Sequence, residues 1–163
     1  MKIAYLHGLD SNNFGPKYDW LNSISELFEP SIDYRENRIF HKIKKEIQKF
    51  QPDFIIGSSM GGYFAYEIAK ELNIKALLFN PALHSRSYEP DIYGLENNKF
   101  NPTMYFILGK NDSIINPYKT IEIIENEGFT YQDFSLQSYA HDTSLELFKK
   151  EVLSKIWPTS SLI

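Results

Sequence analysis

Short apolar segments recur along the chain, and polar or turn-forming residues bound each of them. Four of these segments are apolar on both alternations, which is typical of strands buried on both faces of a parallel sheet. They cover residues 3–6, 54–56, 76–79 and 104–108. Two weaker candidates for strands are residues 31–34 and 131–136. The pattern therefore predicts a sheet of short strands.

Helical periodicity fills the stretches between these strands. Apolar stripes that fit one face of a helix run through residues 18–28, 39–50, 62–72, 117–127 and 145–157. Pro52 ends the second of these helices, and Thr143 and Glu146 have the spacing of a capping box for the last. Strands that alternate with helices predict right-handed crossovers and a doubly wound α/β sheet.

Length and composition limit the class of protein. The chain has 163 residues, which suits one domain over residues 1–163 with a single sizeable core. Hydrophobic residues make up 42% of the chain and aromatic residues 15%, so we expect it to be folded rather than disordered.

Charge and cysteine usage exclude several functions. The net charge of −4 gives no reason to expect nucleic acid or an anionic membrane as a partner. The chain has no cysteine, which excludes disulfides, thiolate metal sites and a cysteine nucleophile. No apolar stretch approaches the ~20 residues of a membrane span, and the N-terminal apolar run is too short for a signal peptide. We therefore expect a soluble, cytoplasmic protein.

One glycine-rich stretch contains two adjacent serines. Residues 54–69 read FIIGSSMGGYFAYEIA, and only Ser59 has glycine two positions before and two positions after it, at Gly57 and Gly61. A strand that turns sharply into a helix holds its apex residue in a strained conformation and leaves no room for a Cβ at the flanking positions. The stretch lacks the lysine of a phosphate loop. We interpret Ser59, rather than Ser58, as a nucleophile; the alternative is a glycine-rich turn without catalytic function.

A serine nucleophile requires a base, and the base works best with an acid that orients it. In hydrolases built on such sheets the chain order is serine, acid, histidine. His141 follows the last predicted strand, whereas His84 precedes the expected position of the acid, so we predict His141 as the base. Asp112, on the loop after residues 104–108, is the predicted acid, although it could simply form an Asx-turn. Asp142 is the competing candidate, but adjacent side chains on a loop rarely face each other well.

The oxyanion that develops in acyl transfer requires two preorganised N–H donors. The backbone N–H of Met60 directly follows the nucleophile and is the first expected donor. The second is expected in the loop after the first strand, where Gly8 permits a tight bend, and we assign it to the N–H of Leu9.

Ligands of doubly wound sheets bind beyond the carboxyl ends of the strands. The candidate substrate-binding side chains there and in the lid-like loop 81–102 are His7, Asn80, His84 and Arg86. His7 could instead anchor its loop by hydrogen bonds, and Arg86 could be an ordinary surface arginine. The histidines lack the spacing of a metal site, so we expect no metal and no organic cofactor.

Five segments, in chain order, carry a family resemblance: YLHGLDSN, IIGSSMGGYFA, LFNPA, GKND and AHD. Together they resemble the small YqiA-like esterases of the α/β-hydrolase superfamily over the whole chain. The resemblance implies a reduced hydrolase fold and hydrolysis of an ester or thioester, with Ser59, Asp112 and His141 in the triad positions. The loop SYAHD lacks the glycine common before the histidine, and residues 84–101 differ from the family pattern, so no substrate is carried over.

We therefore predict a reduced α/β-hydrolase fold. Its sheet has six mostly parallel strands in the order 2-1-3-4-5-6, with helices on both faces and a minimal lid. Ser59 is predicted to attack the carbonyl of a small-molecule ester. Two other functions stay open, namely acyl transfer through the same acyl-enzyme and a non-catalytic binding module. Residues 159–163 are expected to fray, and no feature of the sequence determines the oligomeric state.

Overall fold

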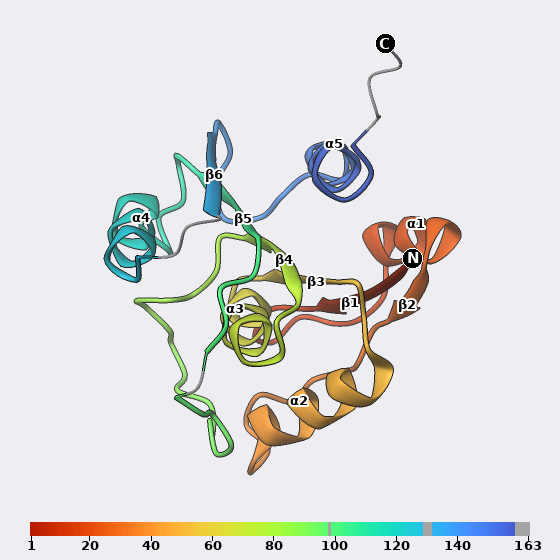
Figure 1. The fold of residues 1–163 in the computed structure, drawn as a ribbon. Coiled ribbons are helices and arrows are strands. Elements are labelled where there is room, and N and C mark those ends of the chain that lie inside the picture. The colour runs from red at the N-terminus through yellow and green to blue at the C-terminus, as the bar shows by residue number, and fades with distance from the viewer. Residues whose placement is uncertain (98, 129–131, 159–163) are drawn as a thin grey trace.

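The computed structural model describes residues 1–97, 99–128 and 132–158 (Figure 1). One sheet contains the strands β1 (Lys2–Leu6), β2 (Glu26–Phe28), β3 (Phe54–Ser58), β4 (Lys75–Phe79), β5 (Met104–Gly109) and β6 (Gln132–Gln137). Their order is β2-β1-β3-β4-β5-β6, and every neighbouring pair is parallel. The predicted strand order is confirmed. All carboxyl ends of the strands therefore lie at one edge of the sheet.

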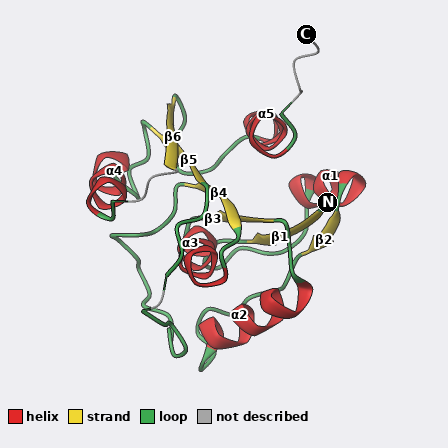
Figure 2. Ribbon diagram, viewed as in Figure 1, coloured by secondary structure: helices red, strands yellow, loops and turns green. Residues whose placement is uncertain are grey.

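The helices of the described residues are α1 (Pro16–Ile24), α2 (Ile39–Phe50), α3 (Met60–Leu72), α4 (Pro117–Asn126) and α5 (Leu145–Ile156). Figure 2 shows helices on both sides of the sheet. Side chains of α1 and α5 form one buried cluster, and side chains of α2, α3 and α4 form the other. In β1, Ile3 and Tyr5 enter the first cluster while Ala4 and Leu6 enter the second, because successive strand residues point to opposite faces. This explains why the strand segments are apolar on both alternations.

The first helix ends earlier than the predicted residue 28. It ends at Ile24, and the extended backbone of Ser25 (φ −148°, ψ 165°) leads directly into β2. β2 then pairs with β1 over three positions, from Lys2 opposite Glu26 to Ala4 opposite Phe28. This edge pairing overrides the apolar stripe that suggested a helix to residue 28.

Residues 31–34 were wrongly predicted as the second strand. Ile32 and Tyr34 are buried on alternate positions, as in a strand. However, the Ile32 N–H donates to Nε2 of His7 at 2.9 Å, and the Tyr34 hydroxyl donates to the His7 carbonyl at 2.5 Å. The segment is therefore bonded to the loop after β1 instead of to a neighbouring strand.

Two further boundaries differ from the prediction. The hydroxyl of Ser144, not that of Thr143, caps α5 by accepting the N–H of Leu147 at 3.1 Å. α3 begins at Met60, directly after the predicted nucleophile. The prediction for residues 159–163 lies outside the described residues.

The loop between β4 and β5 contains the predicted lid-like segment 81–102. Asp91 accepts the N–H of Arg38 at 2.8 Å, and Glu71 of α3 accepts the N–H of Glu96 at 2.6 Å. Residues 91 and 96 of the loop are therefore bonded to the start of α2 and to α3. Its first residues, within 82–87, line a small cavity beside Ser59.

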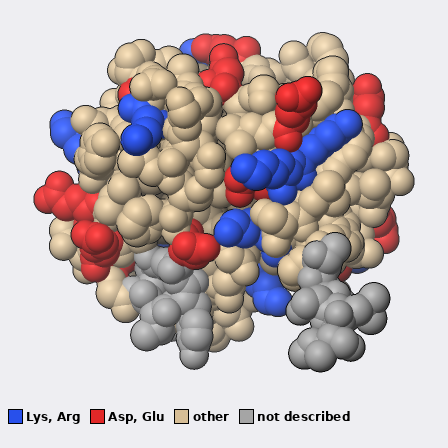
Figure 3. Space-filling model, turned by 90° about the horizontal axis from the view of Figure 1, so that it is seen from above, with Lys and Arg blue, Asp and Glu red and all other residues tan. Residues whose placement is uncertain are grey.

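The distribution of surface charge and the length of the helices are relevant to nucleic-acid and membrane partners. On the face shown in Figure 3, acidic and basic side chains are intermixed instead of gathered by sign. Within residues 1–97, 99–128 and 132–158, no helix has the length and apolar character needed to span a membrane.

Candidate active site

Ser59 lies at the apex of the turn from β3 into α3. Its φ of 55° and ψ of −117° are strained for a residue with a Cβ. Backbone hydrogen bonds hold it there: its N–H donates to the Phe79 carbonyl at 3.1 Å, and its carbonyl accepts from Tyr63 at 3.1 Å and Ala82 at 2.9 Å. The strained turn is therefore fixed by β4, by α3 and by the loop after β4.

The two flanking glycines are required by two different close approaches. A Cβ on Gly57 would overlap the carbonyl of Gly61 and lie 2.8 Å from the Cβ of Ala65, as expected for the turn itself. A Cβ on Gly61 would instead overlap the carbonyl oxygens of Leu6 and His7. Gly61 therefore allows the loop after β1 to approach the beginning of α3.

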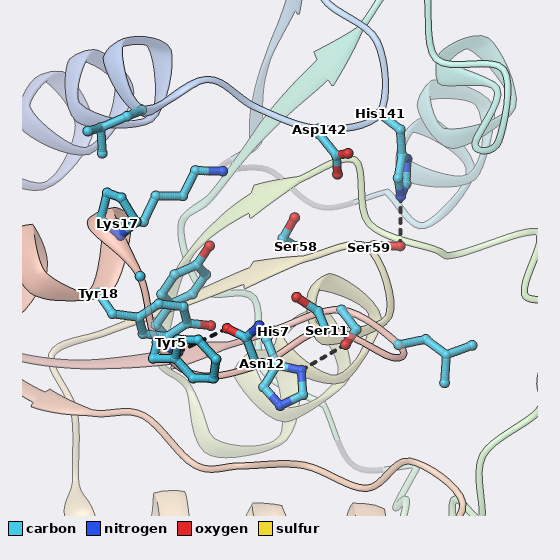
Figure 4. A pocket seen from close by; sticks show the side chains of 16 residues that line it. Tyr5, His7, Ser11, Asn12, Lys17, Tyr18, Ser58, Ser59, His141 and Asp142 are labelled. Atoms are coloured by element: carbon cyan, nitrogen blue, oxygen red, sulfur yellow. Dashed lines mark hydrogen bonds between the residues drawn. The ribbon is translucent and has the colours of Figure 1, made fainter.

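A continuous hydrogen-bonded path joins the three predicted triad side chains. Nε2 of His141 lies 3.0 Å from Oγ of Ser59, and Nδ1 of His141 lies 2.8 Å from Oδ2 of Asp112. The Asp112 side chain is fully buried, while that of His141 is 19% exposed. Figure 4 shows the imidazole directed at Ser59 at the edge of a cavity. Asp142, the competing acid, lines that cavity.

Asp112 uses its two oxygens for different purposes. Oδ1 accepts the N–H groups of Ile114 and Ile115 at 2.8 and 2.9 Å, which is the Asx-turn considered as its alternative role. Oδ2 faces His141. A carboxylate only accepts hydrogen bonds, so Nδ1 of His141 donates and Nε2 is left to accept the hydroxyl of Ser59.

Asn80 fixes the loop that carries the histidine. Its buried Nδ2 donates to the carbonyls of His141 and Ala140 at 2.8 and 3.2 Å, and its Oδ1 accepts the N–H of Gly109 at 2.7 Å. The Tyr139 hydroxyl donates to the Ile107 carbonyl at 2.7 Å, and burial raises its pKa. These contacts indicate that Asn80 holds the loop of His141 in position, and its predicted contact with substrate stays a prediction. The sequence prediction missed Tyr139, which stands in the loop that lacks the expected glycine.

The other predicted substrate-binding side chains are hydrogen-bonded within the protein. His7 is buried: its Nδ1 donates to the Gly8 carbonyl at 2.7 Å, and its Nε2 accepts from Ile32. Burial lowers its pKa, although the bond to Gly8 opposes that shift. The neutral ring therefore anchors its loop, as the alternative interpretation expected. Nε2 of His84 donates to the Asn116 carbonyl at 3.0 Å, and His84 is absent from the lining of both cavities beside Ser59.

Arg86 lines the small cavity beside Ser59, but its guanidinium is already bound within the protein. Nε donates to Glu89 at 3.0 Å, and a terminal nitrogen donates to the carbonyls of Ala82 and Leu83 at 2.7 and 3.0 Å. The group also lies 4.1 Å from the ring centre of Tyr63. These contacts use much of its hydrogen-bonding capacity.

The two predicted oxyanion donors flank Ser59. Met60 is the first residue of α3, so its N–H has no acceptor inside the helix. Leu9 follows Gly8, where an added Cβ would lie 3.4 Å from the Cβ of Ser59. The loop after β1 is thus close enough to Ser59 for the Leu9 N–H to be a candidate donor.

Two cavities open beside the nucleophile. The larger, of about 450 Å³, is polar and contains His141, Lys17 and Asp142 in its lining (Figure 4). The smaller, of about 200 Å³, is lined by apolar side chains and by the start of the β4–β5 loop. Ser59 and Leu9 line both cavities, whereas His141 lines only the larger of the two. A carbonyl at Ser59 would therefore have space on either side.

Comparisons with known proteins agree with this architecture. The profile of an uncharacterised protein family, UPF0227, matches residues 2–116. This match confirms the resemblance to the YqiA-like proteins. No protein of curated function matches the sequence.

Solved structures with the same fold are similar at low sequence identity. An esterase from Pyrococcus furiosus has a TM-score of 0.72 and 14% identity, covering 95% of this chain and 79% of that one. The serine hydrolase FphF from Staphylococcus aureus, described as fluorophosphonate-binding, has a TM-score of 0.66 and 17% identity, covering 98% and 84%. A monoacylglycerol lipase from Paleococcus ferrophilus has a TM-score of 0.66 and 12% identity, covering 86% of each chain. These likenesses establish the α/β-hydrolase fold.

Proposed function

The chain belongs to the uncharacterised protein family UPF0227, and from its site we propose that it is a serine hydrolase acting on small carboxylic esters or thioesters. One observation carries the proposal: the path of hydrogen bonds from Ser59 through His141 to Asp112, on a strained strand–helix turn beside a cavity. A serine, a histidine and a buried carboxylate in this arrangement are the parts that acyl transfer requires.

In the first half of the proposed reaction, the acyl group moves to the enzyme. Oγ of Ser59 bonds to the carbonyl carbon while its proton passes to Nε2 of His141, and Asp112 stabilises the imidazolium. The N–H groups of Met60 and Leu9 hold the oxyanion. The bond from carbon to the leaving oxygen or sulfur then breaks, and His141 gives its proton to the departing atom.

In the second half, water releases the acid. A water oxygen bonds to the acyl carbon as its proton passes to Nε2 of His141. The bond between that carbon and Oγ of Ser59 then breaks, and Oγ takes the proton back from His141. The acid leaves and the serine is regenerated, so the cycle requires neither a metal nor an organic cofactor.

The smaller cavity suits the acyl group. Leu9, Met60, Ile114 and Ile115 give it an apolar lining next to Ser59, and its volume of about 200 Å³ suits a short chain. We therefore include a short apolar acyl group in the proposal. A cytoplasmic location remains a prediction from the sequence.

The proposal is tested with chromogenic esters of increasing acyl length, followed by product analysis. We expect turnover of short acyl esters, with free acid as the product even when an acceptor alcohol is present. Formation mainly of the new ester would support acyl transfer instead of hydrolysis. No turnover across the series, with water or with acceptors, would support a binding module and contradict the proposal.

A further inference from the structure

We propose that the larger cavity receives the leaving group of the substrate, and that Lys17 selects leaving groups which carry an anionic substituent such as a carboxylate or a phosphate. This inference rests on the proposed function, because it assigns a substrate class to the same site.

The position of His141 determines which cavity holds the leaving group. His141 must give a proton to the departing oxygen or sulfur, so that atom has to lie within hydrogen-bond reach of Nε2. His141 lines the larger cavity and is absent from the lining of the smaller one. The departing atom therefore lies toward the larger cavity, and the acyl group is left to occupy the smaller one.

Lys17 gives the larger cavity a positive charge. Lys17, in the first turn of α1, extends its side chain toward the part of the cavity where Ser58 and Asp142 lie (Figure 4). It is half-buried, and its Nζ lies 5.4 Å from the ring centre of Phe148. None of the ion pairs formed by the described residues involves Lys17.

Arg86 and Lys17, the cationic side chains that line the two cavities, differ in how they are bonded within the protein. Arg86, in the smaller cavity, pairs with Glu89 and donates to two backbone carbonyls. Lys17, in the larger cavity, has lost part of its hydration without gaining an ion pair with any residue that the structure describes. Burial lowers its pKa, and the charge of Asp142 opposes that shift. A ligand anion beside Lys17 would supply the missing partner, because a desolvated ammonium is stabilised by an opposite charge.

The negative charge of Asp142 should oppose the effect of Lys17 on an anionic leaving group. Asp142 is exposed, lines the same cavity and carries the charge that would repel an anionic ligand. Removing the charge of Lys17 should weaken selection of an anion, whereas removing the charge of Asp142 should strengthen it. A role for Lys17 that is only structural does not predict opposite effects of these two changes.

The test uses two esters with the same acyl group and nearly isosteric leaving groups, 3-carboxyphenyl butyrate and 3-carbamoylphenyl butyrate. The measured quantity is the ratio of their kcat/KM values, each divided by its rate of hydrolysis by hydroxide. We expect the wild type to favour the carboxylate and Lys17→Gln to lower the ratio by about tenfold or more. Asp142→Asn should raise the ratio, and Lys49→Gln, on the exposed face of α2, is the matched control that should not change it.

A binding measurement covers the case in which neither ester is turned over. Titration with the product phenols, 3-hydroxybenzoate and 3-hydroxybenzamide, should show tighter binding of the carboxylate that is lost in Lys17→Gln. Equal ratios, or equal product affinities, in the wild type and Lys17→Gln would overturn the inference. Turnover that depends on Ser59 but not on the charge of Lys17 would overturn this inference alone and leave the proposed function standing.

Discussion

The substitution Ser59→Ala is expected to lower ester turnover by about 10³-fold or more, because it removes the hydroxyl that forms the acyl-enzyme in the proposed reaction. The oxyanion donors and the cavities would remain, so residual turnover should approach what those features supply without a nucleophile. The measurement is kcat for a short acyl ester, with substrate affinity followed separately to show that the site is intact.

The neighbouring serine provides a matched control for this result. Ser58 is the last residue of β3 and lacks the strained backbone of Ser59. Ser58→Ala should lose no more than about tenfold in kcat, since it removes only one hydroxyl from the wall of the cavity. If Ser59→Ala retained turnover while Ser58→Ala lost it, the nucleophile would be the other serine and the assigned register of the turn would be wrong.

Asp112→Asn is expected to lower kcat by about 10³- to 10⁴-fold while the protein stays folded. An asparagine oxygen can still accept the N–H groups of Ile114 and Ile115, which preserves the turn. Its amide nitrogen would then face Nδ1 of His141 and favour the tautomer with a proton on Nε2. In that tautomer Nε2 cannot accept the proton of Ser59.

The control for Asp112→Asn is the same change at Asp142, the other candidate acid. Kinetics and thermal unfolding of both variants separate a loss of catalysis from a loss of stability. We expect Asp142→Asn to retain far more turnover on a neutral ester than Asp112→Asn. An equal or larger loss in Asp142→Asn would contradict the assignment of the acid.

The residues alone indicated a doubly wound sheet and selected the side chains that meet at its edge, and the strand order was predicted together with the family resemblance. Short segments that are apolar on both alternations indicated four of the strands, and each selected triad residue follows a strand at its carboxyl end. Because parallel strands bring those ends to one edge, residues 59, 112 and 141 could be expected to meet without any knowledge of their distances. The structure brings all three within hydrogen-bond distance.

The second strand could not be predicted, because local pattern and tertiary pairing disagree there. Leu27 and Phe28 continue a helical stripe, but their backbone pairs with β1. Ile32 and Tyr34 alternate as in a strand, but their hydrogen bonds go to His7. In both segments a partner distant in the sequence determines the backbone conformation.

The contacts of Asn80 and the position of Lys17 could also not be predicted from the sequence. Asn80 holds the histidine loop through bonds that span 60 and 61 residues. In the sequence, no feature distinguishes Lys17 from an ordinary surface lysine. The structure shows that α1 places it beside the larger cavity. Such roles depend on which loops meet, and periodicity carries no information about that.

The most direct test of the central claim is covalent labelling with a fluorophosphonate probe, followed by intact mass measurement and peptide mapping. The account predicts a single phosphonyl adduct on Ser59 in the wild type and in Ser58→Ala, and none in Ser59→Ala. Folded wild-type protein that stays unlabelled, or an adduct mapped to a residue other than Ser59, would contradict it.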